Sequence, residues 1–236
     1  RGTNMHILDR IQVGMPAIDV AQVLFDQHNL LLMEFAVYQC EERPHFAEAK
    51  KKNPKARRSP AEALQHTPDS GEPVTLVQNI ADFDKIRLLM RDLKEIDPKA
   101  TKIASYVDPE DRNRTYIHEA LKLISRVRTR VGTCHIPLLD LDIAIDEHPS
   151  DIVFPYIKEI AQLLGVGSGA VVNSGKSYHL WGLELMSKNA WYDFMYNALL
   201  LDRIDRRWVA HRLKDRQANI RVSPKWGQMP RVAYVF

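Results

Sequence analysis

The chain has 236 residues, of which 45% are hydrophobic and 27% are charged, and its formal net charge is +3. This length allows one large domain or two small ones, and the composition is ordinary for a soluble globular protein. No apolar run approaches the roughly 20 residues of a transmembrane helix and no signal-peptide pattern is present, so we expect no membrane partner. The only cysteines, Cys40 and Cys134, exclude a disulfide framework and a cysteine-rich zinc site and favour a reducing, cytoplasmic compartment.

The first part of the chain, residues 1–99, shows helix and strand patterns in alternation. The spacing of apolar residues predicts a helix, two strands and a second helix, in the order 18–25, 30–39, 74–77 and 83–93. Residues 42–73 lack a sustained period and hold six lysines and arginines between 50 and 58, which indicates a basic surface loop. The loop charge fits either solvated surface or a nucleic-acid footprint. We expect an N-terminal α/β part packed on the rest of the chain.

The second part, residues 100–236, alternates strands and helices around a central hairpin. Strands are predicted over 103–107, 137–145, 170–173, 176–183, 219–223 and 232–236. A first helix is predicted from Asp108, with Ile117, Leu121 and Ile124 on its inner face and its end among Arg126, Arg128 and Arg130. A second is capped by Ser150 and buries Val153, Tyr156, Ile157, Ile160 and Leu164, and a third is capped by Ser187 and buries Trp191, Phe194, Met195 and Ala198. A short fourth helix is predicted over 208–213. This order favours an α+β fold, with a mixed or antiparallel sheet and flanking helices. The chain ends on a strand-like segment, so we expect one compact catalytic unit of a longer protein.

Two carboxylates interrupt the apolar strand over residues 137–145. Side chains alternate across a strand, so Asp140 and Asp142 are expected on one face while Leu139, Leu141 and Ile143 pack on the other. Neighbouring carboxylates repel each other and lose hydration in an apolar setting, and a shared cation is the usual remedy. The pair therefore indicates a site for divalent metal.

A loose phosphate-loop match at residues 170–177 is rejected. That loop must curl around phosphates and lead into a helix, whereas Val171 and Val172 favour extended backbone and the following Tyr-His-Leu-Trp is typical of a strand. Read as a strand, the segment places Ser177 and His179 on one face, with Lys176 at the mouth of a Ser-Gly turn. These donors suit the phosphate tail of a nucleotide, although a Ser-His pair satisfied by local hydrogen bonds fits the same pattern.

A third carboxylate would complete a site for two metals. Asp202 and Asp205 are both candidates, and Asp205 is preferred because Asp202 falls in the last turn of the preceding amphipathic helix. Farther along, Arg221, Ser223 and Lys225 alternate onto one face, as phosphate or template ligands or as an exposed edge strand.

In their order and spacing, these motifs resemble the archaeo-eukaryotic primase superfamily, in particular the catalytic core of its primase-polymerase members. The resemblance spans about residues 100–236 and rests on the segments Leu138-Leu139-Asp140-Leu141-Asp142, Ser177-Tyr178-His179, Ile204-Asp205 and Ile220-Arg221-Val222-Ser223. It implies a core of RNA-recognition-motif type beside a variable N-terminal part. It also implies that Asp140, Asp142 and Asp205 hold two Mg²⁺ or Mn²⁺ ions, that Ser177 and His179 bind nucleotide phosphates, and that Lys176, Arg221, Ser223 and Lys225 add contacts to phosphate or template.

The expected activity is template-directed nucleotide polymerisation on two metal ions, as a DNA primase, a DNA polymerase or both. The expected partners are nucleoside triphosphates, a single-stranded or primed DNA template, and a helicase or other domain beyond this chain. Two alternatives stay open at this point. A metal-dependent nuclease would use the same carboxylates without a triphosphate site, and a non-catalytic nucleic-acid-binding module would use the acidic strand only structurally.

Overall fold

The computed structural model describes residues 6–42, 75–79, 82–93, 116–225 and 227–236. The helices are α1 (Ile7–Arg10), α2 (Ala17–Gln27), α5 (Phe83–Asp92), α7 (Ser150–Leu163), α8 (Lys188–Ala198) and α9 (Arg206–Asp215). The strands are β1 (Leu32–Glu42), β2 (Thr75–Asn79), β3 (Tyr116–Thr129), β4 (Gly132–His135), β5 (Leu138–Ala144), β6 (Gly169–Asn173), β7 (Ser177–Gly182), β8 (Met186–Ser187), β9 (Asn219–Arg221) and β10 (Arg231–Val235). None of these helices has the length and apolar character needed to cross a membrane.

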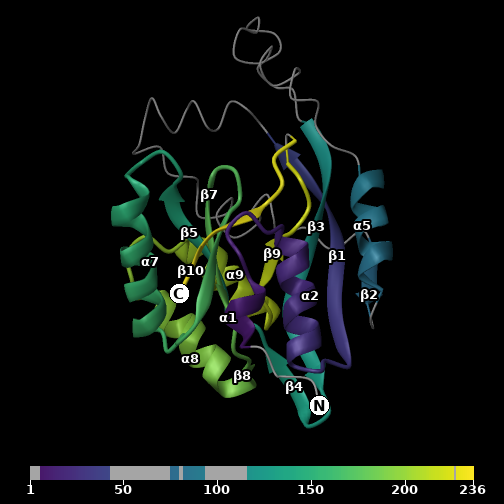
Figure 1. Ribbon diagram of the computed structural model, residues 1–236, viewed down its shortest axis with the longest axis horizontal. Coiled ribbons are helices and arrows are strands. Elements are labelled where there is room, and N and C mark those ends of the chain that lie inside the picture. Colours follow the sequence, from purple (N-terminus) through teal and green to yellow (C-terminus); the bar gives the residue numbers. More distant parts are fainter. Residues whose placement is uncertain (1–5, 43–74, 80–81, 94–115, 226) are drawn as a thin grey trace, which may run out of the picture.

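The described strands form two antiparallel sheets. One has the order β2-β1-β3-β4-β8, with β9 also pairing with β3, and the other has the order β10-β6-β7-β5. In Figure 1, α7 flanks the smaller sheet on the left and α5 flanks the larger sheet on the right. The predicted α+β class with antiparallel sheets and flanking helices is therefore confirmed.

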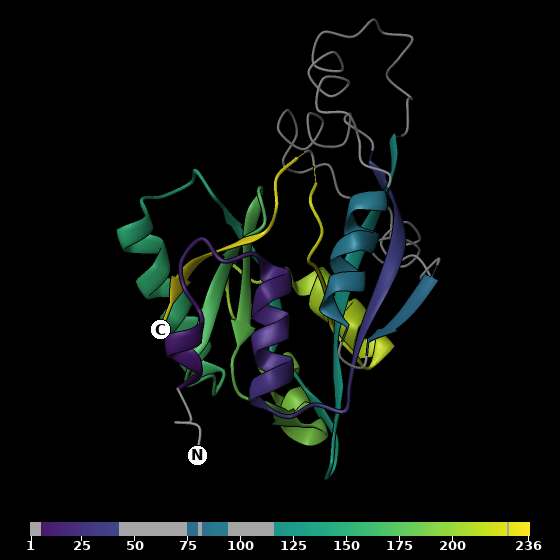
Figure 2. The same ribbon diagram turned by 45° about the vertical axis from the view of Figure 1, so that its right-hand side comes forward.

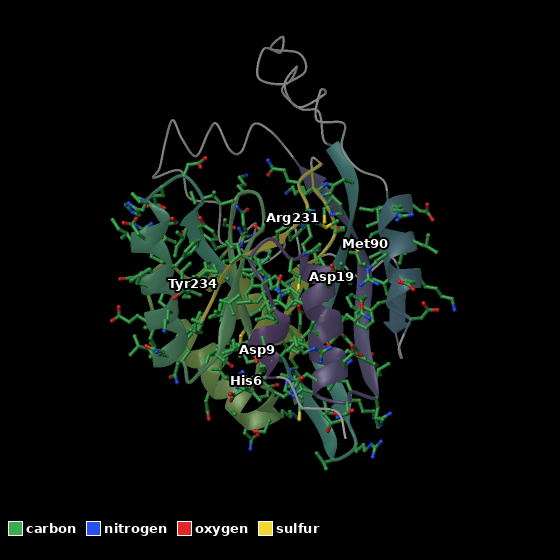
Figure 3. All side chains as sticks on the ribbon, viewed as in Figure 1. His6, Asp9, Asp19, Met90, Arg231 and Tyr234 are labelled. Atoms are coloured by element: carbon green, nitrogen blue, oxygen red, sulfur yellow. The ribbon has the colours of Figure 1, made fainter. Side chains whose placement is uncertain are left out.

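Helix α2 lies between the two sheets and is buried along most of its length (Figure 2). Its apolar residues join a core that includes side chains from both sheets, with Trp181, Trp191 and Phe35 fully enclosed. Asp19 of α2, labelled in Figure 3, forms an ion pair with Arg87 of α5, with 2.6 Å between the guanidinium nitrogen and the carboxylate oxygen. The strands β1 and β2, from before residue 100, share one sheet with β3, β4, β8 and β9, from after it. The boundary at residues 99/100 stays a prediction.

The largest correction concerns β3, which sequence spacing predicts as a helix burying Ile117, Leu121 and Ile124. The segment is a 14-residue strand paired with β1, β4 and β9. Its central residues are buried on both faces. The alternation of apolar and polar residues that marks a strand with one solvent-exposed face is therefore missing. Arg126 and Arg128 accordingly lie on a strand and not at a helix end. The expected strand over 103–107, the helix cap at Asp108 and the basic loop lie outside the described residues.

Two details of α7 also differ from the prediction. The N-cap is Pro149, which makes no side-chain cap bond, and Ser150 is already the first helical residue. Tyr156, expected to point inward, is 38% exposed. The cap predicted at Ser187 of α8 is confirmed, because its hydroxyl accepts a hydrogen bond from the Ala190 amide at 3.3 Å.

The buried His135 of β4 makes the stability of the fold depend on pH. Burial, together with the nearby positive charges of Arg126 and Lys188, lowers the pKa of His135 from 6.5 to about 4. Its Nδ1 lies 3.3 Å from the Ser125 hydroxyl, and its ring stacks on Trp191 with 4.6 Å between ring centroids. Between pH 6.5 and 4 the unfolded chain therefore binds a proton that the folded chain does not.

We expect the free energy of unfolding to fall by about 3 kcal/mol through this histidine as the pH drops from 6.5 to 4. Urea unfolding of the wild type and of His135→Gln across this range measures the effect as the difference between the two curves, because the other groups titrate in both proteins. The exposed His148→Gln serves as the control and should follow the wild type. Parallel curves for wild type and His135→Gln would contradict the assignment.

Candidate active site

The acidic strand β5 forms as its sequence predicts. Leu139, Leu141 and Ile143 are buried, while Asp140 is half-buried and Asp142 is exposed. The burial alternates from Leu139 onward, so the two carboxylates share the face opposite Leu139, Leu141 and Ile143. Asp140 pairs with His179 of β7, and the register between β5 and β7 shifts between Asp140 and Ala144, the stretch that holds Asp142.

Strand pairing brings His179 and Asp205 to either side of Asp140. His179 of β7 pairs directly with Asp140, and its Nε2 lies 3.8 Å from the Asp140 Oδ1. On the other edge of β5, Leu141 and Ile204 form an isolated antiparallel bridge, and the Asp205 amide donates to the Asp140 carbonyl oxygen at 3.2 Å. Residues directly opposite each other in an antiparallel pair carry their side chains on one face. His179, Asp140 and Asp205 therefore follow one another across the sheet.

Asp205 also begins α9. Its Oδ1 accepts a hydrogen bond from the Trp208 amide at 2.9 Å, which satisfies one of the amides left unpaired at a helix start. Asp202, the alternative third carboxylate, is 88% exposed and forms an ion pair with Arg206 at 3.1 Å. Of these two aspartates, the structure places Asp205 beside Asp140.

The β6–β7 hairpin adds polar groups at the mouth of the site. Both segments are extended strands and no helix starts at Lys176, which agrees with the rejection of a phosphate loop. Gly175 adopts a φ of +96°, in the left-handed region that favours glycine, and its amide donates to Asn173 Oδ1 at 2.8 Å. The Ser174 hydroxyl donates to the Ser177 carbonyl at 2.8 Å. The turn is thereby held in one shape, with Lys176 exposed at its end.

Residues of the hairpin, β5, β9, β1 and β3 line a cavity of about 180 Å³. Its described lining residues are Cys40, His118, Ala120, Lys122, Asp140, Ser174, Gly175, Lys176, Ser177, His179, Trp208, Asn219, Ile220, Arg221, Lys225 and Gln228. Six predicted site residues are among them, namely Asp140, Lys176, Ser177, His179, Arg221 and Lys225. Asp142, Asp205 and Ser223 are not.

Ser223 and Arg221 have structural contacts that the sequence does not predict. Ser223 is completely buried, and its hydroxyl accepts a hydrogen bond from the Leu121 amide at 3.0 Å. The Arg221 guanidinium donates to the Ser223 carbonyl at 2.7 Å and to the Ser174 carbonyl. Arg221 thus links β9 to the hairpin turn at the wall of the cavity. The Ser223 hydroxyl, in contrast, forms its hydrogen bond with the backbone of β3.

The sequence interpretation does not find several polar residues of the cavity, among them His118, Lys122 and Asn219. His118 and Lys122 lie on β3, which the sequence pattern predicts as a helix, so that pattern does not place them on one strand face. Read with a period of two, His118, Ala120 and Lys122 fall on one face, and that signal could have found them.

The cavity is predominantly basic. Its side chains of formal charge among the described residues are the cations Lys122, Lys176, Arg221 and Lys225 and the single anion Asp140. Several cations around one cavity are suited to an occupant with several negative charges.

The metal predicted for the carboxylates has suitable donors but no preformed cluster. Within the described ranges, no group of three or more His, Cys, Asp or Glu side chains is gathered closely enough to hold an ion. Asp140, Asp142 and Asp205 nevertheless supply carboxylate oxygens from adjacent positions on β5 and its neighbour, and these are the ligands that Mg²⁺ and Mn²⁺ prefer. Holding an ion requires their side chains to turn toward a common point.

A model of the archaeo-eukaryotic primase 1D-like family (AEP-like) matches residues 100–233, more than half of the chain. The chain belongs to this family, and with it to a superfamily of primase and nucleotidyltransferase type. No curated protein and no solved structure matches the chain.

Proposed function

We propose that the protein is a two-metal nucleotidyltransferase that synthesises nucleic acid on a DNA template from nucleoside triphosphates, as a DNA primase, a DNA polymerase or both. The observation that carries the proposal is the cavity, which combines Asp140 and His179 of adjacent strands with the cations Lys176, Arg221 and Lys225. Family membership supports the same class of chemistry.

Each part of the site has a distinct task in this proposal. The cavity cations and the Ser177 hydroxyl bind the triphosphate of the incoming nucleotide. The buried His179, paired with Asp140 across the strands, donates to a phosphate oxygen and orients the tail. Asp140, Asp142 and Asp205 would hold two Mg²⁺ or Mn²⁺ ions, which neutralise charge at the attacking 3′-hydroxyl oxygen and at the leaving pyrophosphate. The new bond joins that oxygen to the α-phosphorus as the bond to the pyrophosphate breaks, and the proton of the hydroxyl is released to water.

The nuclease alternative fits the site less well. Hydrolysis of a phosphodiester needs the carboxylates but no binding site for a triphosphate, whereas four cations line this cavity. A non-catalytic binding module would need neither the carboxylates beside Asp140 nor a cavity. The polymerising reaction uses both features.

The test supplies purified protein with nucleoside triphosphates or deoxynucleoside triphosphates and Mg²⁺ or Mn²⁺. One set of reactions contains a primed DNA template and another an unprimed one, and products are resolved on a gel. Incorporation on either template is the expected result. Metal-dependent shortening of the DNA would establish a nuclease instead, and a shifted DNA band with neither product would establish a binding module.

A further inference from the structure

The end of β3 that lies away from the cavity carries exposed arginines. Arg126 and Arg128 are exposed and lie two residues apart on a regularly paired part of the strand, with the buried Val127 between them, so they share one face. Arg130 follows in the turn to β4 and is also exposed. Arg126 pairs with Glu34 at 3.1 Å, but Arg128 and Arg130 form no ion pair within the described ranges. This end of the sheet therefore presents uncompensated positive charge to solvent.

Helix α8 places a series of aromatic rings next to these arginines. His135 of β4 is the strand partner of Arg126, and Trp191 of α8 stacks on the His135 ring with 4.6 Å between centroids. Tyr192 meets Trp191 edge-on at 5.2 Å, and Tyr196 stacks on Tyr192 at 6.2 Å with 23° between the ring planes. Figure 1 shows β4, β8 and α8 together at the lower end of the molecule. The arginines and the tyrosines thus belong to one continuous set of contacts.

The rings become more exposed with distance from the sheet. Trp191 is completely buried and holds α8 on β4, Tyr192 is half-buried, and Tyr196 is 55% exposed. Lys188, one turn before Tyr192 on α8, is exposed and lies near enough to His135 for its charge to lower the pKa of that histidine. A largely exposed tyrosine ring, held in place by a stacked neighbour and bordered by cations, is suited to stacking on a nucleobase.

We propose that the arginine row (Arg126, Arg128 and Arg130) and the tyrosine pair (Tyr192 and Tyr196) form a binding surface for single-stranded DNA outside the cavity. The arginines contact backbone phosphates, and the tyrosine pair stacks on unpaired bases. A DNA duplex keeps its bases stacked on one another, and an acidic protein would use the charges without the rings. The combination of both features favours a single strand. The inference rests on the proposed function for the choice of DNA as the ligand.

The surface is separated from the cavity along β3. Lys122 lines the cavity, and Arg128 lies six residues farther along the strand, about 20 Å at roughly 3.3 Å per residue. A template held there does not touch the acidic strand or the residues that bind the triphosphate. We therefore expect the surface to act on template affinity and not on the chemical step. At saturating DNA the double variant Arg128→Gln/Arg130→Gln should keep the wild-type kcat, while its KM for the template rises about tenfold.

The test measures binding of a labelled oligothymidylate by fluorescence anisotropy at several salt concentrations, without metal or nucleotide. Arg128→Gln/Arg130→Gln is expected to weaken binding about tenfold and to reduce the slope of log K against log salt by about 1.4, since each phosphate contact on a single strand contributes about 0.7. The matched control is Arg91→Gln/Lys214→Gln, which removes two exposed cations from the last turns of α5 and α9 and should bind like the wild type.

Base stacking is tested separately at Tyr196. Tyr196→Ala is expected to weaken oligothymidylate binding about tenfold, whereas Tyr196→Phe keeps the ring and should bind like the wild type. An abasic oligonucleotide of the same length has phosphates but no bases. Its affinity should fall in the arginine double variant and stay unchanged in Tyr196→Ala.

The outcomes separate this surface from the proposed function. Unchanged affinity in Arg128→Gln/Arg130→Gln, or a loss as large in the control double variant, overturns the surface and leaves polymerisation standing. Wild-type binding by Tyr196→Ala, or tighter binding of duplex than of single-stranded DNA, overturns the assignment to a single strand. Binding that depends on both the arginines and Tyr196, in a protein that incorporates no nucleotide, supports the surface and overturns polymerisation alone.

Discussion

Asp140→Asn is expected to lower the rate of nucleotide incorporation about a thousandfold while changing the free energy of unfolding by less than about 1 kcal/mol. Asp140 is the one carboxylate among the described residues that line the cavity, and it lies 3.8 Å from His179. Asparagine has nearly the same size and preserves packing on β5, but it carries no charge to hold a cation. Primer extension with saturating nucleotide gives the rate, and urea unfolding gives the stability.

Asp142→Asn should lose activity to a similar degree, because two ions need carboxylates from more than one residue to bridge them. The matched control is Asp202→Asn, whose carboxylate is 88% exposed and lies away from the cavity. This control should keep the wild-type rate. A rate for Asp140→Asn within threefold of the wild type would remove the carboxylate strand from the mechanism.

How much of this site is readable from the sequence depends on how local its determinants are. The face shared by Asp140 and Asp142 follows from the alternation of five residues, so the prediction needs no tertiary information. The Ser-Gly turn before β7 is equally local, because glycine accommodates the positive φ at its position. These parts of the site were predicted, and the hairpin and β5 are confirmed as strands.

The parts that failed depend on burial by distant strands. β3 pairs with three strands, so apolar side chains occupy both of its faces and spacings of three and four residues mimic a helix. Because the segment is predicted as a helix, the sequence does not place Lys122 on the strand face that lines the cavity. Ser223 was predicted on the same face as Arg221 by strand alternation. β9 ends at Arg221, so this alternation does not extend to Ser223. Only the contact with Leu121 reveals where the Ser223 hydroxyl lies.

Asp205 has two roles, as the N-cap of α9 and as the neighbour of Asp140. A set of variants can separate these roles. Asp205→Asn and Asp205→Ser keep a good N-cap and remove the charge, whereas Asp205→Ala removes both. We expect all three to lower incorporation about a thousandfold if the carboxylate holds metal. Only Asp205→Ala should also lose about 1 kcal/mol of stability, since the Trp208 amide then lacks its acceptor.

The comparison with Asp202 decides which aspartate is the third carboxylate. Asp202 caps no helix and pairs only with Arg206 at the surface among the contacts described for it, so Asp202→Asn and Asp202→Ala should leave both rate and stability unchanged. Wild-type activity in Asp205→Asn, with a stability loss confined to Asp205→Ala, would reduce Asp205 to a helix cap. Loss of activity in Asp202→Asn instead would identify the exposed Asp202 as the third carboxylate. Because the bridge between Leu141 and Ile204 aligns Asp205 with Asp140, we expect the activity loss at Asp205.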